Sequence, residues 1–293
     1  MYYYKIAGLY LYSERDLVRL GLYSFKPFAV ECCTITPDCQ LKFVPQLDIS
    51  SYDITHELSQ SYVADANADS NLYRTEHGYL YTIKQRIEGA KVTIFHIDSH
   101  TCNITTNISI ANDIDLSLLR FGIWIMFGIV MTNHNAIAIH SSTIVSKGRA
   151  VLFLGESGTG KSTHTRLWRE HIEGATLLND DSPIIRIEQN EVKAYGSPWS
   201  GKTPCYKNES YPIGGICRLV QAPKNHINRL TTIMSIGAIL PSCPPMFAHD
   251  DILQDRICET VGNIVRQTPI YVLECLPDSN AAKLSHSTII GDE

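Results

Sequence analysis

The chain has 293 residues, a length that allows about two domains or one large one. Apolar residues make up 44% and charged residues 19%, which are ordinary fractions for a globular protein and exclude a disordered or fibrous chain. The 25 Lys and Arg against 30 Asp and Glu give a net charge of −5, so the chain lacks the charge pattern of a nucleic-acid-binding protein. The first residues contain no apolar segment typical of a signal peptide, and none of the nine cysteines forms a C-x-x-C pair. We therefore expect a cytoplasmic protein with reduced thiols.

The first part of the chain, residues 1–112, is expected to be a small β-rich domain that binds a substrate or partner. Short apolar or alternating runs predict strands, and polar stretches such as Ala64–Asn71 separate them; the runs are Phe28–Cys33, Tyr79–Gln85, Lys91–Asp98 and Cys102–Ile110. His96 and His100 have a spacing that suits a metal site on a helix. Because the surrounding segment alternates as a strand does, the two rings would lie too far apart, and no metal is expected there.

An apolar segment, Leu116–Thr132, is interrupted by Arg120. The charge-free part that begins at Phe121 is shorter than the roughly 20 residues that a membrane-spanning helix needs. We therefore expect a buried helix over Asp115–Asn133 and no membrane span. Since the segment is apolar on nearly every side, it is either core or a subunit interface, which leaves a homo-oligomer possible.

The second part, residues 113–293, mixes helical and extended patterns and is expected to be an α/β domain with a mixed sheet. Strands Ala136–Val145 and Ala150–Leu154 are expected to form an antiparallel hairpin around the turn at residues 146–149. The expected elements are strands Ala136–Val145 and Ala150–Leu154, helix Lys161–His171, strand Thr176–Leu178, a helix near Asp250–Gln267, strand Ile270–Cys275 and a helix near Asn280–Leu284.

Residues 155–162 read GESGTGKS and match the Walker A pattern G-x-x-x-x-G-K-[ST] between an expected strand and an expected helix. The glycines permit backbone conformations in which successive N–H groups hold phosphate oxygens, helped by the positive end of the helix. The lysine would reach the β- and γ-phosphates, and the serine hydroxyl would bind Mg²⁺. A plain glycine-rich turn would explain neither residue. The expected ATP-binding residues are Gly155, Glu156, Ser157, Gly158, Thr159, Gly160, Lys161, Ser162 and Thr163.

Asn179-Asp180-Asp181 follows at an expected strand end, where such a nucleotide site needs an acidic group for Mg²⁺. Adjacent residues of an extended strand point in opposite directions, so the two carboxylates are expected to have separate roles, one at the metal and one as general base. The alternative is a simple turn, which suits the composition Asp-Asp-Ser-Pro. His140 ends an apolar strand, and a histidine in such a place is more often structural than catalytic.

His140, GESGTGKS and the Asn-Asp-Asp sequence, in this order, resemble the HPr kinase/phosphorylase family, whose nucleotide-binding core is shared with ATP-dependent phosphoenolpyruvate carboxykinase. Further segments are similar to a subgroup of small HPr kinase-like serine kinases, which includes kinases of lasso-peptide precursors and is related to free-serine kinases. These segments are Ala194–Lys202, Ile213–Ala222 with Asn225, and Pro277-Asp278 with Ala281-Ala282. The resemblance covers about residues 115–293, and the first 112 residues contribute nothing to it.

The resemblance implies a carboxykinase-like P-loop core with ATP and Mg²⁺ as cofactors. It implies that Asp180 is the general base, that Asp181 has a metal or phosphate role beside the metal-binding Ser162, and that His140 lies near the transferred phosphoryl group together with Lys161. It also implies that Lys202 holds a phosphate or the acceptor. Trp199 either lines the nucleotide pocket or is a core aromatic residue.

The function expected from these features is an ATP- and Mg²⁺-dependent kinase that phosphorylates a serine-type hydroxyl of a peptide or protein. Free serine or another small molecule is the alternative acceptor. A nucleotide-binding regulator without transfer activity and a simple ATPase are alternatives of a different class. The glycine-rich C-terminal signature of true HPr kinases is not found in the sequence, so phosphorylase activity and HPr as the acceptor are not implied.

Overall fold

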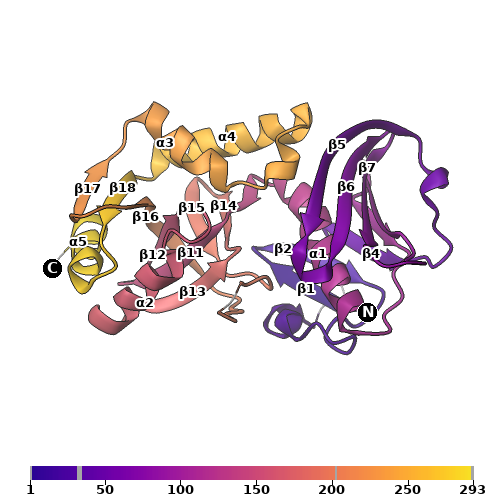
Figure 1. Ribbon diagram of the computed structural model, residues 1–293, viewed down its shortest axis with the longest axis horizontal. Helices are drawn as coiled ribbons and strands as arrows, with labels where there is room; N and C mark the ends of the chain where they lie inside the picture. The colour runs from indigo at the N-terminus through magenta and orange to yellow at the C-terminus, as the bar shows by residue number, and fades with distance from the viewer. Residues whose placement is uncertain (1, 32–34, 202, 292–293) are drawn as a thin grey trace. The chain divides into compact units, whose positions relative to one another are not determined.

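The computed structural model describes residues 2–31, 35–201 and 203–291, and the chain divides into two compact units (Figure 1). The first unit comprises residues 1–133 and 246–254, and the second comprises residues 134–245 and 255–293. This division differs from the boundary expected between residues 112 and 113. Helix α1 (Asp113–Thr132) belongs to the first unit because it packs against the sheet of that unit.

Nine strands, counted over the described residues, form the sheet of the first unit in the order β3-β1-β2-β4-β9-β8-β7-β6-β5. The pairs β2–β4 and β4–β9 are parallel and the other neighbours are antiparallel, so the sheet is mixed and the β-rich expectation is confirmed. The strands are β1 (Tyr2–Ile6), β2 (Leu9–Ser13), β3 (Ala29–Val30), β4 (Cys39–Phe43), β5 (Ile54–Val63), β6 (Ala68–Thr75), β7 (Gly78–Gln85), β8 (Thr93–Asp98) and β9 (Asn103–Thr106). Short 3-10 helices lie at η1 (Tyr23–Phe28), η2 (Ile49–Ser51) and η3 (Ala64–Ala66).

Two expectations for this unit were partly wrong. Of the expected strand Phe28–Cys33, Phe28 ends a 3-10 helix and Ala29–Val30 form a short strand, while residues 32 and 33 lie outside the described residues. The polar stretch Ala64–Asn71 was expected to separate strands, but its second half is the start of β6. His96 lies on β8 as expected from the alternation, and its ring stacks on Tyr52 with 4.4 Å between ring centroids.

Helix α1 is the core helix of the first unit. Asn112 caps its first turn by accepting from the backbone N–H groups of Ile114 and Asp115. It is long and apolar enough to cross a membrane by length and composition alone, but 61% of its most apolar window is buried inside the protein. Gly122 lies against Phe95 of β8 so closely that a Cβ there would be 2.2 Å from the ring. The helix is therefore buried core, as expected.

The returning segment, residues 246–254, is fastened to the first unit by a buried carboxylate. Asp250, whose side chain is wholly buried, forms an ion pair with Arg74 of β6 and accepts a hydrogen bond of 3.0 Å from the hydroxyl of Tyr79. The same carboxylate accepts from the backbone N–H of Leu253 at 2.9 Å, at the start of helix α4 (Asp251–Gln267). The 3-10 helix η5 (Pro245–Phe247) precedes it.

The sheet of the second unit has the order β10-β14-β15-β16-β12-β11-β13 in the described chain, with β18 beside β16 and β17 beside β18. The pairs β12–β16 and β16–β18 are parallel, whereas β11 and β12 form the expected antiparallel hairpin. The hairpin turn places Lys147 at φ 46° and Gly148 at φ 71°, which matches the twist of the flanking strands. The strands are β10 (Ala136–Ala138), β11 (Ser141–Ser146), β12 (Arg149–Leu154), β13 (Thr176–Asp181), β14 (Ile184–Glu188), β15 (Glu191–Tyr195), β16 (Ser210–Gln221), β17 (His226–Arg229) and β18 (Ile270–Cys275).

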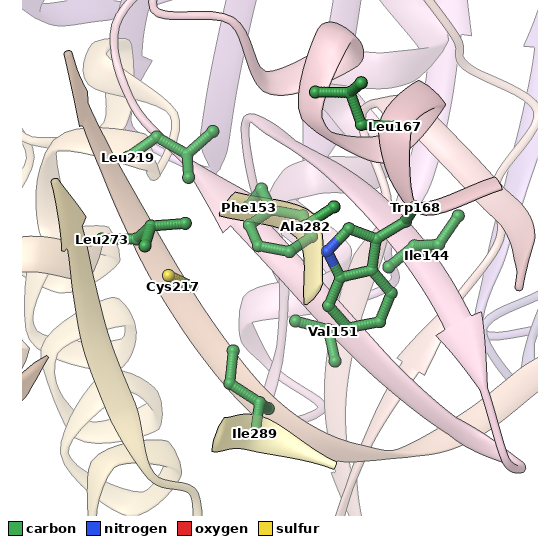
Figure 2. Close-up of a cluster of buried hydrophobic side chains, with 10 residues drawn as sticks. All are labelled: Ile144, Val151, Phe153, Leu167, Trp168, Cys217, Leu219, Leu273, Ala282 and Ile289. Carbon is green, nitrogen blue, oxygen red and sulfur yellow. The ribbon is translucent and has the colours of Figure 1, made fainter. Parts of the chain in front are cut away.

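One face of this sheet is covered by helices α2 (Lys161–His171) and α5 (Ser279–Ile289), and Figure 2 shows the apolar cluster between them and the strands. Trp168 of α2 is wholly buried there, and its Nε1 donates a 2.9 Å hydrogen bond to the hydroxyl of Ser285 on α5. Helix α3 (Thr232–Ile239) and the 3-10 helix η4 (Leu240–Ser242) follow β17. The cluster fixes α2 on the sheet, and with it the loop that leads into α2. The fold is thus mixed α/β, as the sequence predicted.

Candidate active site

The glycine-rich loop, residues 155–162, leaves β12 and enters α2 as the sequence predicted. Gly155, Gly158 and Gly160 have φ values of 150°, 84° and 100°, which residues with a side chain rarely adopt. A Cβ on Gly155 would lie 2.5 Å from the hydroxyl oxygen of Thr159, so this position also lacks space for a side chain. Gly160 is the N-cap of α2, and no side chain among the described residues caps the helix. The free N–H groups of the first turn therefore face the loop.

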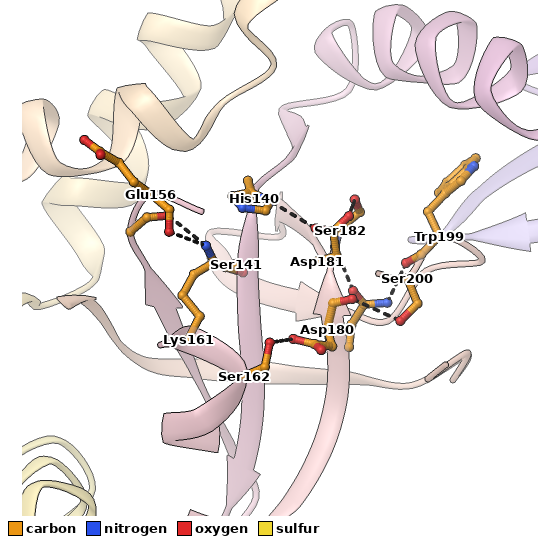
Figure 3. Close-up of polar contacts among 12 residues, drawn as sticks. His140, Ser141, Glu156, Lys161, Ser162, Asp180, Asp181, Ser182, Trp199 and Ser200 are labelled. Atoms are coloured by element: carbon orange, nitrogen blue, oxygen red, sulfur yellow. Dashed lines mark hydrogen bonds and ion pairs between the residues drawn. The ribbon is translucent and has the colours of Figure 1, made fainter. Parts of the chain in front are cut away.

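Lys161 is buried to 9% exposure, and its ammonium group is held by the loop itself (Figure 3). Its Nζ donates to the carbonyl oxygens of Gly155 at 2.8 Å and Glu156 at 3.1 Å. Burial lowers the pKa of Lys161, although the nearby carboxylates of Asp181 and Asp180 oppose this shift. The cation thus lies at the loop and close to both acidic residues.

Asp180 contacts the second residue of helix α2. The hydroxyl of Ser162 donates a hydrogen bond of 3.0 Å to Oδ1 of Asp180, and Asp180 is only 5% exposed. In the sheet, Asp180 lies opposite Ser142 of β11, whose hydroxyl is 2.9 Å from that of Thr165 on α2. The Asp180 carboxylate therefore belongs to the face of the sheet that α2 covers.

Asp181 lies on the opposite face and contacts His140, as the alternation of the strand predicts (Figure 3). The distance from His140 Nδ1 to Asp181 Oδ1 is 3.1 Å, and the two side chains are 45% and 42% exposed. Burial tends to raise the pKa of Asp181, but the hydrogen bonds and charge of His140, with a hydrogen bond from Ser182, hold it below its ordinary value. The carboxylate is therefore an accessible anion at neutral pH.

His140 lies at a break that the sequence did not predict. The segment Ala136–Val145 was expected to be one strand, but β10 pairs with β14 whereas β11 pairs with β12 and β13. The chain changes partners between the two strands, and the backbone N–H of His140 donates to the carbonyl of Ser242 at 2.7 Å. This break leaves the imidazole exposed beside Asp181.

Asn179 organises the loop that follows β15, a role that sequence reasoning missed. Its buried side-chain amide donates to the carbonyl oxygens of Trp199 at 2.9 Å and Cys205 at 3.3 Å, and to the hydroxyl of Ser197. Its Oδ1 accepts from the backbone N–H of Ser182 at 2.9 Å. One side chain thus joins this loop to the strand end that carries both carboxylates.

The structure describes one of the remaining expected residues, Trp199, but not the other, Lys202. Trp199 is 5% exposed, which favours a core aromatic residue over a lining of the nucleotide pocket. Lys202 lies outside the described residues. Its neighbour Gly201 donates its backbone N–H to the carbonyl of Asp180 at 2.7 Å. Among the described residues, no group of three or more His, Cys, Asp or Glu side chains could form a metal cage.

A cavity of about 340 Å³ opens beside the glycine-rich loop. It is lined by residues 156–159 of the loop and by residues 218–221 at the end of β16. The side-chain amide of Gln221 donates to the carbonyl of Gly158 at 3.3 Å and so connects the two walls. Sequence reasoning identified the loop but not the second wall, because the parallel pairing of β12 and β16 joins segments more than 60 residues apart.

Comparison with known proteins gives little further information. No family model matches the chain, and no curated protein matches it. A solved structure of the Hpr(Ser) kinase/phosphatase from Coxiella burnetii is similar to part of it, with 14% sequence identity and a TM-score of 0.31. That similarity covers 52% of this chain and 93% of the other. At this level of similarity, the functional interpretation rests on the residues of the site itself.

Proposed function

We propose that the chain is an ATP- and Mg²⁺-dependent kinase that transfers the γ-phosphate to a serine-type hydroxyl. The observation that carries this proposal is the hydrogen bond between Ser162, the last residue of the GESGTGKS loop, and the buried carboxylate of Asp180. In phosphate-binding loops of this type, the hydroxyl holds Mg²⁺ and an acidic group at a neighbouring strand end supports it. Lys161, at the same loop, is available for the β- and γ-phosphates.

The oxygen atoms of Ser162 and Asp180 fit Mg²⁺, which keeps several waters and needs only one or two protein ligands beside the phosphates. When bound, Mg²⁺ would neutralise charge on the phosphate oxygens. The loop N–H groups would position the triphosphate, and Lys161 would exchange its carbonyl partners for phosphate oxygens. The chain's own contribution is thus mainly positioning and charge stabilisation.

The contacts favour an exchange of the roles that the resemblance implies for the two carboxylates. Asp180 is buried against Ser162, so we assign it to the metal side. Asp181 is accessible and hydrogen-bonded to His140, so we assign it to accept the proton of the acceptor hydroxyl. His140 would orient this carboxylate through Nδ1, and its other ring nitrogen remains available to the acceptor or the phosphoryl group.

We propose a peptide or protein as the acceptor, with free serine as the alternative. The observation that favours a larger acceptor is the exposure of the Asp181 and His140 side chains, at 42% and 45%, within the second unit. A small free substrate needs an enclosing pocket, whereas a segment of a larger molecule can be presented to an open surface. The cytoplasm, which supplies ATP, is the proposed location.

Matched substitutions of the two carboxylates test the role assignment. Asp181→Asn should keep Mg²⁺-dependent ATP binding but reduce transfer by about a hundred-fold or more, the usual range for loss of a general base. Asp180→Asn should weaken the Mg²⁺ dependence of ATP binding itself. Titration calorimetry with and without Mg²⁺, beside a transfer assay, measures both effects. Near-normal transfer by Asp181→Asn would remove it from the base role and return that role to Asp180.

A further inference from the structure

Arg218 of β16 lies on the same face of the sheet as Asp181, at the level of the glycine-rich loop. It pairs with Leu154, the last residue before the loop, and Leu154 pairs with Ser141, which in turn pairs with Asp181. Side chains that lie directly opposite one another in neighbouring strands share a face. Four residues therefore form one row across β16, β12, β11 and β13, with Arg218 at one end and Asp181 at the other.

The guanidinium group of Arg218 has few hydrogen-bond partners, although its side chain is not fully exposed. Its Nη1 donates a long hydrogen bond of 3.3 Å to the carbonyl of Ala238. Within the part of the chain that the structure describes, no carboxylate forms an ion pair with it. A guanidinium has five N–H donors, so most of them remain available.

Arg218 also brings a second positive charge to the loop. It lines the cavity of about 340 Å³ together with residues 156–159, and it is near enough to Lys161 to contribute to lowering the pKa of that residue. Two cations near the glycine-rich loop repel each other, and an anion bound between them would offset this cost. The planar guanidinium is suited to bidentate contact with a phosphate group.

We infer that Arg218 is a catalytic residue that contacts the terminal phosphoryl group of the nucleotide bound at the loop. The inference rests on the proposed kinase function and specifies how its site distinguishes a nucleoside triphosphate from a diphosphate. The loop backbone holds the inner phosphates, so the cations at its mouth are left for the terminal group. An arginine placed there would stabilise charge on the transferring phosphoryl group from the side opposite Asp181 and the acceptor.

The test compares the affinities of MgATP and MgADP in Arg218→Gln and Arg218→Lys. The hydrogen bond from Arg218 to the Ala238 carbonyl is already long at 3.3 Å, so its loss in Arg218→Gln should change the fold little. We expect Arg218→Gln to lose about ten- to a hundred-fold in MgATP affinity, the usual effect of one hydrogen bond to a charged group. MgADP affinity should change less than about two-fold, and Arg218→Lys should recover part of the loss. Arg229→Gln, on the exposed strand β17 of the same sheet, is the matched control.

The outcomes separate this inference from the proposed function. Suppose that the wild type binds MgATP, and that Arg218→Gln lowers the affinities for MgATP and MgADP equally or lowers neither. Arg218 then does not contact the terminal phosphoryl group, and this inference is overturned while the proposed function stands. If the wild type binds neither nucleotide, the proposed kinase function fails and the inference fails with it. A selective loss for MgATP in both variants, with Arg229→Gln unchanged, is the result that supports it.

Discussion

Asp181 combines a strained backbone with an accessible carboxylate. Its φ of 117° lies in a region that residues with side chains avoid, at a cost of order 1–3 kcal/mol. A β-bridge to Ser200 and a hydrogen bond of 3.1 Å from the Ser182 hydroxyl help to hold it there. Strain of this kind persists where the surroundings fix it and is concentrated at functional sites. The geometry therefore supports a role for this carboxylate beyond stability.

The hydrogen bond between His140 and Asp181 predicts a change in the pH dependence of transfer. Burial raises the pKa of Asp181, and the contact with His140 opposes burial and lowers it. Replacement of His140 by Ala removes the contact that lowers the pKa of Asp181. That pKa should therefore rise, and the acid limb of the rate profile should move to higher pH. The same contact stabilises the fold at neutral pH and is lost as pH falls through the lowered pKa.

The pH profile of transfer, measured from about pH 4 to pH 8, checks this prediction. His140→Asn, whose amide can still donate to Asp181, is the control and should shift the acid limb less. An acid limb that does not move in His140→Ala would mean that Asp181 is not the group whose ionisation limits the reaction.

At the scale of residues, the sequence did not predict how the side chains of the proposed site pair. The alternation of an extended strand predicts that Asp180 and Asp181 point to opposite faces. The partner of each carboxylate depends on the register of β13 against β11 and on where α2 packs. These are long-range contacts, which local patterns do not encode.

At the scale of elements, the loop after β15 depends on the side chain of Asn179. We expect Asn179→Ala to lower the free energy of unfolding by about 2–4 kcal/mol, because it removes the acceptor of the buried Ser182 N–H and a donor to the Trp199 and Cys205 carbonyls. Transfer should fall as well, since the loop packs against the strand end that carries Asp181. Denaturant unfolding beside a transfer assay measures both effects.

Asn228→Ala, on the exposed strand β17, is the matched control and should change stability by less than about 0.5 kcal/mol. If Asn179→Ala were as stable as this control, the amide would not be the anchor of the loop.

The elements themselves were predicted well where the pattern was strong. Helix α2 and strand β18 have the expected bounds, and the hairpin of β11 and β12 was expected from the apolar runs around Lys147-Gly148. Strand β5 was missed because it is a polar and largely exposed edge strand without an apolar alternation. The break at His140 was missed because both halves of that segment are apolar, so that composition could not show a change of partner.

At the scale of the whole molecule, the returning segment makes the first unit discontinuous in sequence. Asp250→Ala would leave Arg74, the Tyr79 hydroxyl and the N–H of Leu253 without their shared acceptor. Breaking a buried ion pair in this way should lower the free energy of unfolding by about 3–5 kcal/mol. Hydrogen exchange should show the loss first in residues 246–254 and in β6.

Asp251→Ala changes the adjacent, exposed carboxylate and is the control for Asp250→Ala. Equal stability of the two variants would mean that the buried pair contributes nothing to the first unit. The sequence could not predict this arrangement, since Asp250 was visible only as the beginning of an expected helix.

The chain divides into units at a different place from the expected boundary. A homo-oligomer remains a prediction.

We propose that this site transfers phosphate from ATP to a serine-type hydroxyl. The most direct test supplies ATP labelled at the γ-phosphate and Mg²⁺ to wild type and Asp181→Asn, with an extract of the native cell separated by size. We predict label in the peptide and protein fraction with the wild type and none with the variant. Label in the small-molecule fraction would keep the kinase and change the acceptor class. Label that is found only as inorganic phosphate, or remains in ATP, would contradict the proposed kinase function.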